Sequence, residues 1–425
     1  MGCDAKQLKG DKAPLPAGAQ AEELSVNQDV QPLRGVRVLE FSHAVLGPAC
    51  GLVLAELGAT VTRVERTPDG DDTRRLKGFG MGYFPFFNRG KRSVAIDLKT
   101  AAGLDIVKRM AAQTDVIIEN FSPGAMERLG LAYRDVIAVN PRLIYCSLKG
   151  FLPGPYEKRL ALDEVVQMMS GLAYMTGPPG QPLRAGASVI DIMSGLFGAL
   201  GVITALYERA QDGRGRLVQS GLFETAAFVM GHHMAYAALT KTPVPPMPAR
   251  VSAWAVYRTF TSADGRQIFI GITSDKHWQR FCMAFGCEDL LADPRLATNN
   301  QRINEREWLL PLLEQFFLSL PGDEILRRCE QAEIPFAPVA RPEDLFTDPH
   351  LLQSNALVEV ELPDGVHTRL PRLPMLLDGN HRRSDQSLPP VGANTGEVLA
   401  ELGYTDAEIA ALSRSGVIAM PGVRS

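Results

Sequence analysis

The chain has 425 residues, of which 45% are hydrophobic and 22% are charged, and its formal net charge at pH 7 is -4. This length exceeds the size at which one hydrophobic core stops growing, so we expect two domains in a soluble globular protein. A slightly acidic chain has no overall positive field to attract phosphate backbones, which argues against nucleic acid as a partner. An anionic small ligand would need arginines and lysines gathered at one place.

Six cysteines are scattered along the chain without a Cys-x-x-Cys pair, and the two closest, Cys282 and Cys287, have no histidine at zinc-finger spacing. We therefore predict no metal site, and reduced thiols as in a cytoplasmic protein. The first residues lack the apolar stretch of a secretory signal, and no window holds the roughly 18 uninterrupted apolar residues of a membrane-spanning helix. The sequence thus predicts a cytoplasmic protein without a membrane segment.

Residues 1–32 are polar, lack sustained periodicity and are predicted to form a flexible leader. From Gly35 onward, strand-like runs alternate with runs of helical periodicity, which predicts an α/β domain with a mostly parallel sheet covered by helices. The expected strands are VRVLEFS (36–42), ATVTRVER (59–66), KRSVAIDL (91–98), TDVIIENF (114–121) and RLIYCSLKG (142–150).

The second half of the chain begins with a long helical pattern over residues 192–215. We assign residues 33–225 to the N-terminal part of a large domain. A linker is predicted over residues 226–250, because the four prolines between positions 243 and 248 cannot sustain a helix. Residues 251–330 open with a hairpin pattern that turns at Asp264-Gly265 and continue with helical patterns, which predicts a small α+β domain.

The first strand-helix-strand unit is the place to test for a dinucleotide site, because Glu65 ends the second strand where a ribose-binding acid would lie. The turn between strand and helix contains only Gly47 and Gly51, in the wrong register for the G-x-G-x-x-G motif. The spacing therefore argues against nicotinamide binding.

Polar side chains follow several of the expected strands. Arg66, Asn120 and Lys149 each lie at the end of a strand, and such ends meet in the ligand crevice of a doubly wound sheet. These residues are therefore candidates for holding one anionic ligand. The alternative is that each is a solvated surface group.

Asp191 stands in the otherwise small and apolar run RAGASVIDIMSG, with Gly186 and Gly195 on either side. A buried carboxylate is costly unless it is paired or used, so this residue needs a partner or a chemical role. It is a candidate helix N-cap for the run that follows. It is also a candidate nucleophile, with nearby glycine amides holding an oxyanion.

Six blocks follow one another along the chain. They are GVRVLEFSHAVLGP, GATVTRVERTPDGDDTR, NRGKRSVAIDLK, VIIENFSPGAMERLG, DIMSGLFGALGVITALYER and GRGRLVQSGLFETA. In this order they resemble the family III CoA-transferases, a group that includes formyl-CoA transferase and carnitine CoA-transferase and is related to α-methylacyl-CoA racemase. The resemblance extends from about Leu33 to the tail.

The resemblance implies a Rossmann-like large domain built from both ends of the chain, with the smaller α+β domain inserted, so residues 331–425 are expected to return to the large domain. It also implies an interlocked homodimer that acts on acyl-CoA and carboxylic acid substrates. Coenzyme A is then a substrate, and no tightly bound cofactor is expected.

By matching blocks, the resemblance makes Asp191 the covalent nucleophile, which carries CoA as an aspartyl thioester. Asp163 corresponds to an auxiliary acidic residue of some transferases. The residues expected to contact CoA are His43, Ala44, Val45, Arg66, Asn120, Ala125, Arg128 and Lys149.

Two other activities are compatible with an aspartate at this place. The related racemase pairs its aspartate with a histidine, but Leu162 occupies that position here and cannot transfer protons. A catalytically silent CoA-binding protein is the other alternative, and the intact Asp191 argues against it. The glycine-rich loop of formyl-CoA transferase has no counterpart in residues 244–258, so formate and oxalate are not assigned. Succinyl-CoA is a common donor among relatives that lack this loop, so the resemblance favours C4 to C5 dicarboxylates such as succinate, mesaconate, itaconate or malate.

Overall fold

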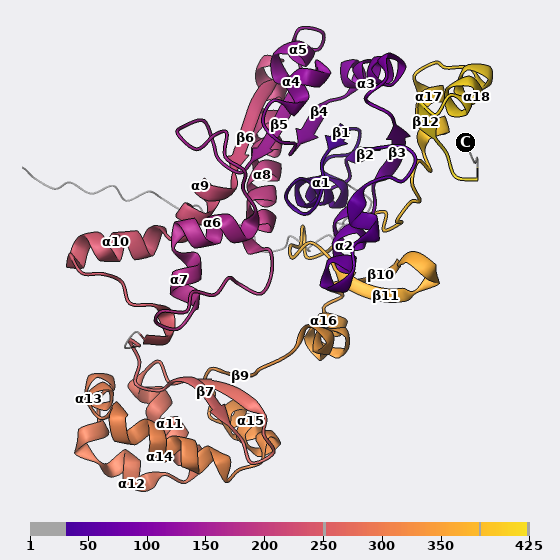
Figure 1. Cartoon of the computed structure of the whole chain (residues 1–425). Helices are drawn as coiled ribbons and strands as arrows, with labels where there is room; N and C mark the ends of the chain where they lie inside the picture. The colour runs from indigo at the N-terminus through magenta and orange to yellow at the C-terminus, as the bar shows by residue number, and fades with distance from the viewer. Residues whose placement is uncertain (1–30, 250–251, 382–383, 423–425) are drawn as a thin grey trace, which may run out of the picture.

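A computed structural model describes residues 31–249, 252–381 and 384–422. The predicted leader therefore lies, except for residues 31 and 32, outside the described residues. The chain forms two bodies, a large one around an extended sheet and a smaller one made mainly of helices (Figure 1). A two-stranded hairpin of β10 (Leu357–Glu361) and β11 (His367–Pro371) lies in the stretch that leads from the small body back to the large one.

The large body contains a seven-stranded sheet in the order β12-β3-β2-β1-β4-β5-β6. Without β12 this is the strand order of the Rossmann fold, and every pair is parallel except β12 with β3. The predicted α/β class with a mostly parallel sheet is confirmed. The strands are β1 (Arg37–Phe41), β2 (Thr60–Glu65), β3 (Arg92–Ile96), β4 (Val116–Glu119), β5 (Ile144–Lys149), β6 (Arg216–Gly221) and β12 (Ile418–Ala419).

Helices cover both faces of this sheet, so its strands read as continuous apolar runs rather than alternating ones. Val38 packs with the helices of one face and Leu39 with those of the other, as the two-residue period of a strand requires. One face carries α1 (Leu46–Glu56) and α8 (Val189–Asp212). The opposite face carries α3 (Ala101–Gln113), α17 (Thr395–Glu401) and α18 (Asp406–Arg414).

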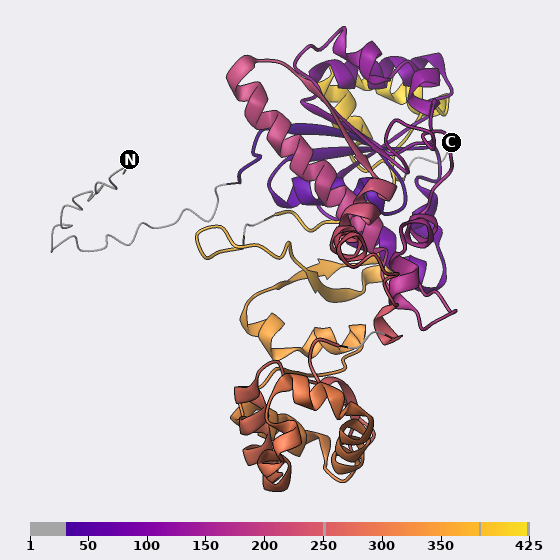
Figure 2. The same ribbon diagram turned by 90° about the vertical axis from the view of Figure 1, so that its left-hand side faces the viewer.

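Helix α8 is long and apolar enough to cross a membrane by length and composition alone, with a mean hydropathy of 2.0 over its best window. It crosses the sheet diagonally in Figure 2 and packs against α1, β5 and β6. A Cβ atom on Gly195 would lie 2.8 Å from the carbonyl oxygen of Leu46. Glycine at this position therefore lets α8 approach α1 closely, and the apolar character of the buried face follows from its place in the core.

The small body has its own hydrophobic core and a three-stranded antiparallel sheet of β7 (Tyr257–Thr261), β8 (Gln267–Gly271) and β9 (Phe336–Pro338). The hairpin predicted at Asp264-Gly265 joins β7 to β8, and Gly265 has the positive φ of 78° that its turn needs. Its longer helices are α11 (Asp275–Phe285), α14 (Arg306–Leu318) and α15 (Gly322–Gln331).

Two predicted boundaries differ from the structure. The first part of the predicted linker is helical, because α9 (Leu222–Val229) and α10 (Gly231–Thr240) precede the first proline at position 243. The small sheet also continues past residue 330, because β9 pairs with β8. The remaining described helices are α2 (Tyr83–Asn88), α4 (Ala125–Leu129), α5 (Tyr133–Ile137), α6 (Asp163–Ser170), α7 (Leu172–Thr176), α12 (Glu288–Ala292), α13 (Asn299–Asn304) and α16 (Pro349–Gln353).

Candidate active site

The strand order of the main sheet reverses between β1 and β4, and ligands of doubly wound folds bind in the crevice beyond such a point. The loops after these two strands are joined there by one side chain. The Asn120 Nδ2 atom donates to the His43 carbonyl oxygen at 3.0 Å, and the His43 amide donates to Asn120 Oδ1 at 3.0 Å. Asn120 therefore fixes the mouth of the crevice.

A cavity of about 150 Å³ opens at this point. Its lining includes His43, Ala44, Asn120 and Lys149, all predicted to contact CoA, together with Asp191 at the start of α8. The structure thus brings the proposed nucleophile and half of the predicted CoA contacts into one cavity. Leu162, at the position of the racemase histidine, lines the same cavity.

Asp191 lies in the first turn of α8 and not at its N-cap, which is Ser188. The N-cap interpretation of Asp191 is therefore wrong. Its backbone amide and that of Ile190 both donate to Asp163 Oδ2, at 2.9 and 2.8 Å. The Asp163 carboxylate thus satisfies two free amides of the helix end from a neighbouring helix, α6.

Asp163 is itself held by Gln167, one turn further along α6. Gln167 is fully buried, donates from Nε2 to Asp163 Oδ1, and accepts the Ala185 amide on Oε1 at 2.9 Å. This clamp of Asp163 and Gln167 ties α6, the loop before α8 and the first turn of α8 together. Sequence reasoning missed Gln167, and its spacing of four residues from Asp163 on one helical face was the available signal.

The Asp191 carboxyl group is strongly perturbed. Burial, followed by the negative charges of Asp163 and Glu164, raises its pKa from 3.8 to about 7, and the positive charge of Arg184 opposes this shift. A raised pKa makes the ionised carboxylate a stronger base and nucleophile than an exposed aspartate. Such perturbation is typical of a catalytic group.

This pKa predicts the pH dependence of the reaction. The resemblance makes Asp191 the nucleophile, and only an ionised carboxylate attacks a thioester. We therefore expect kcat/KM for the acyl-CoA to fall tenfold for each pH unit below about 7 and to level off above it. An ordinary aspartate would keep the rate level down to about pH 4. Initial rates between pH 5 and 9 measure this limb, and a profile that stays level down to pH 5 would contradict it.

Lys149 reaches the cavity with its charge already compensated. Its Nζ atom donates to Glu119 Oε2 at 2.6 Å and to the Phe121 carbonyl oxygen at 2.7 Å. Glu119 is buried at the end of β4, so the pair is a fixed part of the crevice wall. Lys149 therefore offers hydrogen-bond capacity rather than a free positive charge.

The other predicted CoA contacts do not line this cavity. Arg66 pairs with Asp72 and donates to the Gly70 carbonyl oxygen at 3.1 Å. Arg128 is exposed on the short helix α4, which begins at Ala125. Val45 is buried and its side chain packs against α2.

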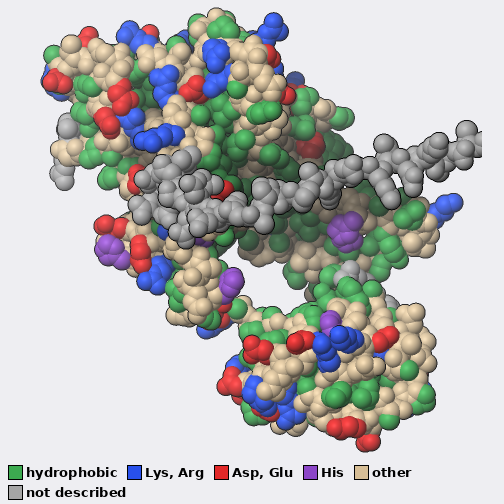
Figure 3. Space-filling view, turned by 180° about the vertical axis from the view of Figure 1, so that it is seen from behind, with side chains coloured by type: hydrophobic (Ala, Val, Ile, Leu, Met, Phe, Trp, Pro, Cys, Tyr) green, Lys and Arg blue, Asp and Glu red, His purple; other side chains and the backbone are tan. Residues whose placement is uncertain are grey.

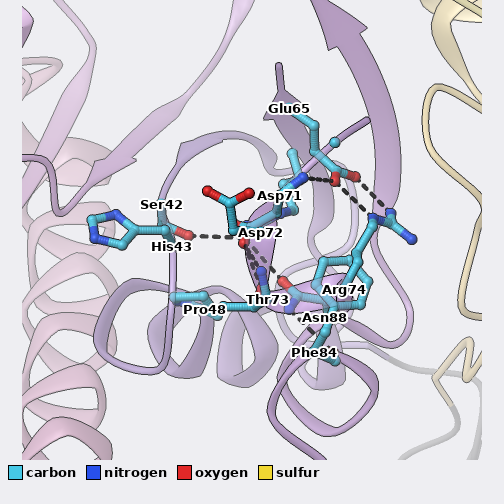
Figure 4. Close-up of polar contacts among 12 residues, drawn as sticks. Ser42, His43, Pro48, Glu65, Asp71, Asp72, Thr73, Arg74, Phe84 and Asn88 are labelled. Carbon is cyan, nitrogen blue, oxygen red and sulfur yellow. Dashed lines mark hydrogen bonds and ion pairs between the residues drawn. The ribbon is translucent and has the colours of Figure 1, made fainter. Parts of the chain in front are cut away.

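The loop after β2 closes on Glu65 rather than on a ligand (Figure 4). The Glu65 carboxylate is 3% exposed and accepts from Arg74 Nη2 at 2.6 Å and from the Asp71 amide at 2.9 Å. All its acceptor capacity is engaged within the protein, which agrees with the missing G-x-G-x-x-G motif and argues against a ribose-binding role.

Beneath the His43 loop lies a buried charge network. Glu40 accepts from Arg63 Nη1 at 2.9 Å and from Lys91 Nζ at 2.9 Å, and Lys91 also donates to the Pro48 carbonyl oxygen at 3.0 Å. Burial lowers the pKa of Lys91 to about 8, against the opposing effect of Glu40. The network anchors α1 and hence the loop that carries His43 and Ala44.

His43 and Gly195 were also predicted to take part in the site. Partial desolvation lowers the pKa of His43, against the opposing effect of Asp71, so its ring is neutral at pH 7. Gly195 faces α1 within the helix, so its amide is not a free oxyanion donor. No cluster of metal-ligating side chains occurs among the residues that the structure describes.

The sheet has the strand order of the doubly wound α/β class, and an aspartate of raised pKa in a cavity at its switch point is typical of an enzyme of this class. Comparison with known proteins gives the family. The family model for CoA-transferase family III matches residues 33–395. The chain therefore belongs to this family and is a CoA-transferase, as the resemblance predicted.

The chain is similar to several named CoA-transferases and to a solved structure. The chain is 32% identical to the succinate–glutarate CoA-transferase of Agrobacterium fabrum, over 87% of this chain and 96% of that protein. It is 29% identical to human succinyl-CoA:glutarate CoA-transferase, over 92% and 90% of the two chains. A solved structure of a CaiB/BaiF family protein from Brucella suis matches with a TM-score of 0.79 at 32% identity, over 88% and 99% of the chains.

Proposed function

We propose that this enzyme transfers CoA from succinyl-CoA, or a similar dicarboxylyl-CoA, to a C4 to C5 dicarboxylic acid through a covalent intermediate on Asp191. The observation that carries the proposal is the Asp191 carboxylate, whose pKa is raised and whose backbone amide is held by Asp163, in the cavity at the switch point. The names of the relatives supply the substrate class.

The proposed reaction is a relay of carboxylate attacks. An Asp191 oxygen attacks the thioester carbonyl of the donor, the C–S bond breaks, and CoA thiolate leaves behind a mixed anhydride. The thiolate then attacks the Asp191 carbonyl carbon, the anhydride C–O bond breaks, and the donor acid departs as a carboxylate. The acceptor carboxylate attacks the aspartyl-CoA thioester, and the same two steps in reverse give the new acyl-CoA and free Asp191.

The protein contributes position and charge to this relay. The clamp of Asp163 and Gln167 holds the first turn of α8, so the backbone that carries the Asp191 carboxylate is fixed before substrate arrives. We place the thiol end of CoA beside His43, Ala44, Asn120 and Lys149. Its nucleotide end extends toward Ala125, Arg128 and Arg66, beyond the strand ends.

The racemase and the catalytically silent CoA-binding protein, the two alternative functions, receive less support. A racemase needs a second proton-transfer group opposite the aspartate, and Leu162 has none. A silent CoA-binding protein would have no reason to keep a carboxylate at the cost of burial that raises its pKa.

A screen of acyl-CoA donors against acceptor acids, followed by mass spectrometry, tests the proposed substrates. We expect new acyl-CoA species from succinyl-CoA with glutarate, itaconate, mesaconate or malate. Exchange of deuterium into the α-carbon without any new acyl-CoA would instead identify a racemase. CoA binding without turnover of any acid would identify a silent protein.

We also propose that the enzyme is a cytoplasmic homodimer whose subunits are interlocked. Apolar side chains are exposed along one face of α8 and over α9 and α10, and no residue of α10 is buried. Figure 3 shows hydrophobic side chains around the opening between the two bodies. A second copy of the chain passing through this opening would cover them. The exposed residues include Leu196, Leu200, Tyr207, Phe228, Met234 and Leu239.

Interlocking predicts that subunits do not exchange. When tagged and untagged dimers are mixed in native buffer, no mixed dimers should form over days, because separation requires at least one chain to unfold. Mixed dimers should appear after joint denaturation and refolding. Native mass spectrometry measures this, and rapid exchange in native buffer would contradict interlocking, as a monomer would contradict the dimer.

A further inference from the structure

The loop between β5 and α6 brings a guanidinium group to the cavity that holds Asp191. Arg159 lines this cavity and is exposed to solvent. Its guanidinium carbon lies 4.9 Å from the ring centre of Tyr156 and 5.9 Å from that of Phe151. Contacts of this kind hold a guanidinium in place without consuming its hydrogen-bond donors.

The charge of Arg159 is uncompensated. In the part of the chain that the structure describes, no carboxylate forms an ion pair with it, although Glu157 lines the same cavity. The neighbouring cations differ, because Lys149 is paired with Glu119 and Arg184 with Glu164. Arg159 is thus the cation on this cavity wall that remains available to an anion.

We propose that Arg159 binds the far carboxylate of the dicarboxylic substrate and so determines the preference for dicarboxylates. The inference rests on the proposed function and adds the group that recognises the substrate. The far carboxylate of a dicarboxylyl-CoA donor approaches the ionised Asp191, and the far carboxylate of the acceptor enters the same cavity, which Glu157 also lines. A guanidinium in this cavity offsets the charge repulsion. The planar fork of arginine also matches both oxygens of a carboxylate.

The phosphates of CoA are the other anions in the proposed reaction that a cation could bind. The pantetheine arm separates these phosphates from the reacting sulfur by its whole length. A cation that shares a small cavity with the nucleophile therefore lies near the acyl group rather than near the phosphates. This placement favours the acid over CoA as the partner of Arg159.

The test compares acceptor acids of equal length, glutarate and valerate, in wild type, Arg159→Gln, Arg159→Lys and the control Lys158→Gln. Lys158 has the same charge and is adjacent in sequence, but it lines a different cavity. In a relay of this kind, kcat/KM for the acceptor reports only the second half-reaction, so the donor does not affect the comparison. CoA affinity is measured in parallel by calorimetry.

We expect Arg159→Gln to lower kcat/KM for glutarate tenfold or more, the loss typical of a charge-assisted hydrogen bond. Valerate turnover and CoA affinity should change less than twofold. The kcat/KM of Arg159→Lys for glutarate should lie between the values of wild type and Arg159→Gln. The kcat/KM of Lys158→Gln should equal that of wild type. Equal losses for glutarate and valerate, or a parallel loss of CoA affinity, would overturn the assignment.

The inference can fail or hold separately from the proposed function. If wild type transfers CoA to no acid, the proposed function fails, and binding of glutarate, followed by saturation-transfer NMR in the presence of CoA, still tests Arg159. Glutarate binding that is lost in Arg159→Gln and kept in Lys158→Gln supports the assignment. Binding unaffected by Arg159→Gln, or no glutarate binding to wild type, overturns it.

Discussion

Replacing Asp191 with asparagine is expected to abolish CoA transfer while leaving CoA affinity within about twofold of wild type. Asparagine has almost the same shape, and the clamp holds Asp191 through its backbone amide, so the fold of the first turn of α8 should persist. The amide oxygen is a poor nucleophile and cannot form the anhydride, so the loss of kcat should reach several orders of magnitude.

The same substitution should stabilise the folded protein at pH 8. The pKa of Asp191 is about 7 in the folded state, higher than the 3.8 of an unfolded chain. The free energy of unfolding therefore decreases as pH rises from about 4 to about 7, because the carboxyl group ionises more easily in the unfolded chain. The favourable effect of an acidic residue at a helix N-terminus, about 0.3–1 kcal/mol, only partly offsets this decrease. Thermal unfolding at pH 5 and pH 8 measures the difference.

Two outcomes would contradict this account of Asp191. Equal loss of CoA affinity and of transfer would make Asp191 a structural residue. A lower melting temperature for Asp191→Asn at pH 8 would show that the carboxylate stabilises the fold.

Substitutions at Asp163 should have the second largest effect, and a pair of them separates position from charge. Asp163→Ala removes the acceptor for the amides of Ile190 and Asp191 and the partner of Gln167. The first turn of α8 then loses its support. A displaced nucleophile typically costs about 100-fold in rate, so kcat should fall by about that factor with a much smaller change in KM for the acyl-CoA.

Asp163→Asn keeps an oxygen for the two amides but removes the negative charge. Because that charge contributes to the raised pKa of Asp191, its loss lowers this pKa. The acidic limb of the pH profile should therefore move to lower pH, while kcat at pH 8 falls less than in Asp163→Ala. Identical rates and pH profiles for the two variants would refute a separate electrostatic role for Asp163.

Much of the main sheet was predictable because it depends on local pattern. Strands buried on both faces read as unbroken apolar runs, as in Val116–Glu119, and helical periodicity marks the crossovers between them. The boundaries of the small body were less predictable. The three-residue strand β9 carries no pattern of its own and is defined only by its pairing with β8.

The residues of the candidate site were predictable in part, but their ion pairs were not. Asn120 and Lys149 were predicted because strand ends converge at a switch point. Asp191 was predicted because a carboxylate in an apolar run needs a role and because the family resemblance places the nucleophile there, and His43 was predicted from the resemblance alone. Whether each charged side chain forms an ion pair was not predictable, because this depends on which residues the fold places beside it. Lys149 meets the buried Glu119 and Arg66 turns to Asp72, whereas Arg159 stacks on aromatic rings and stays unpaired.

The most direct test of the central claim is to trap the intermediate. The enzyme is incubated with succinyl-CoA, treated with hydroxylamine or borohydride, and digested for peptide mass mapping. We expect a hydroxamate or an alcohol at Asp191, absent without succinyl-CoA and absent in Asp191→Asn. An unmodified Asp191 peptide from an enzyme that is turning over, or a mark on another residue, would contradict covalent relay through this carboxylate.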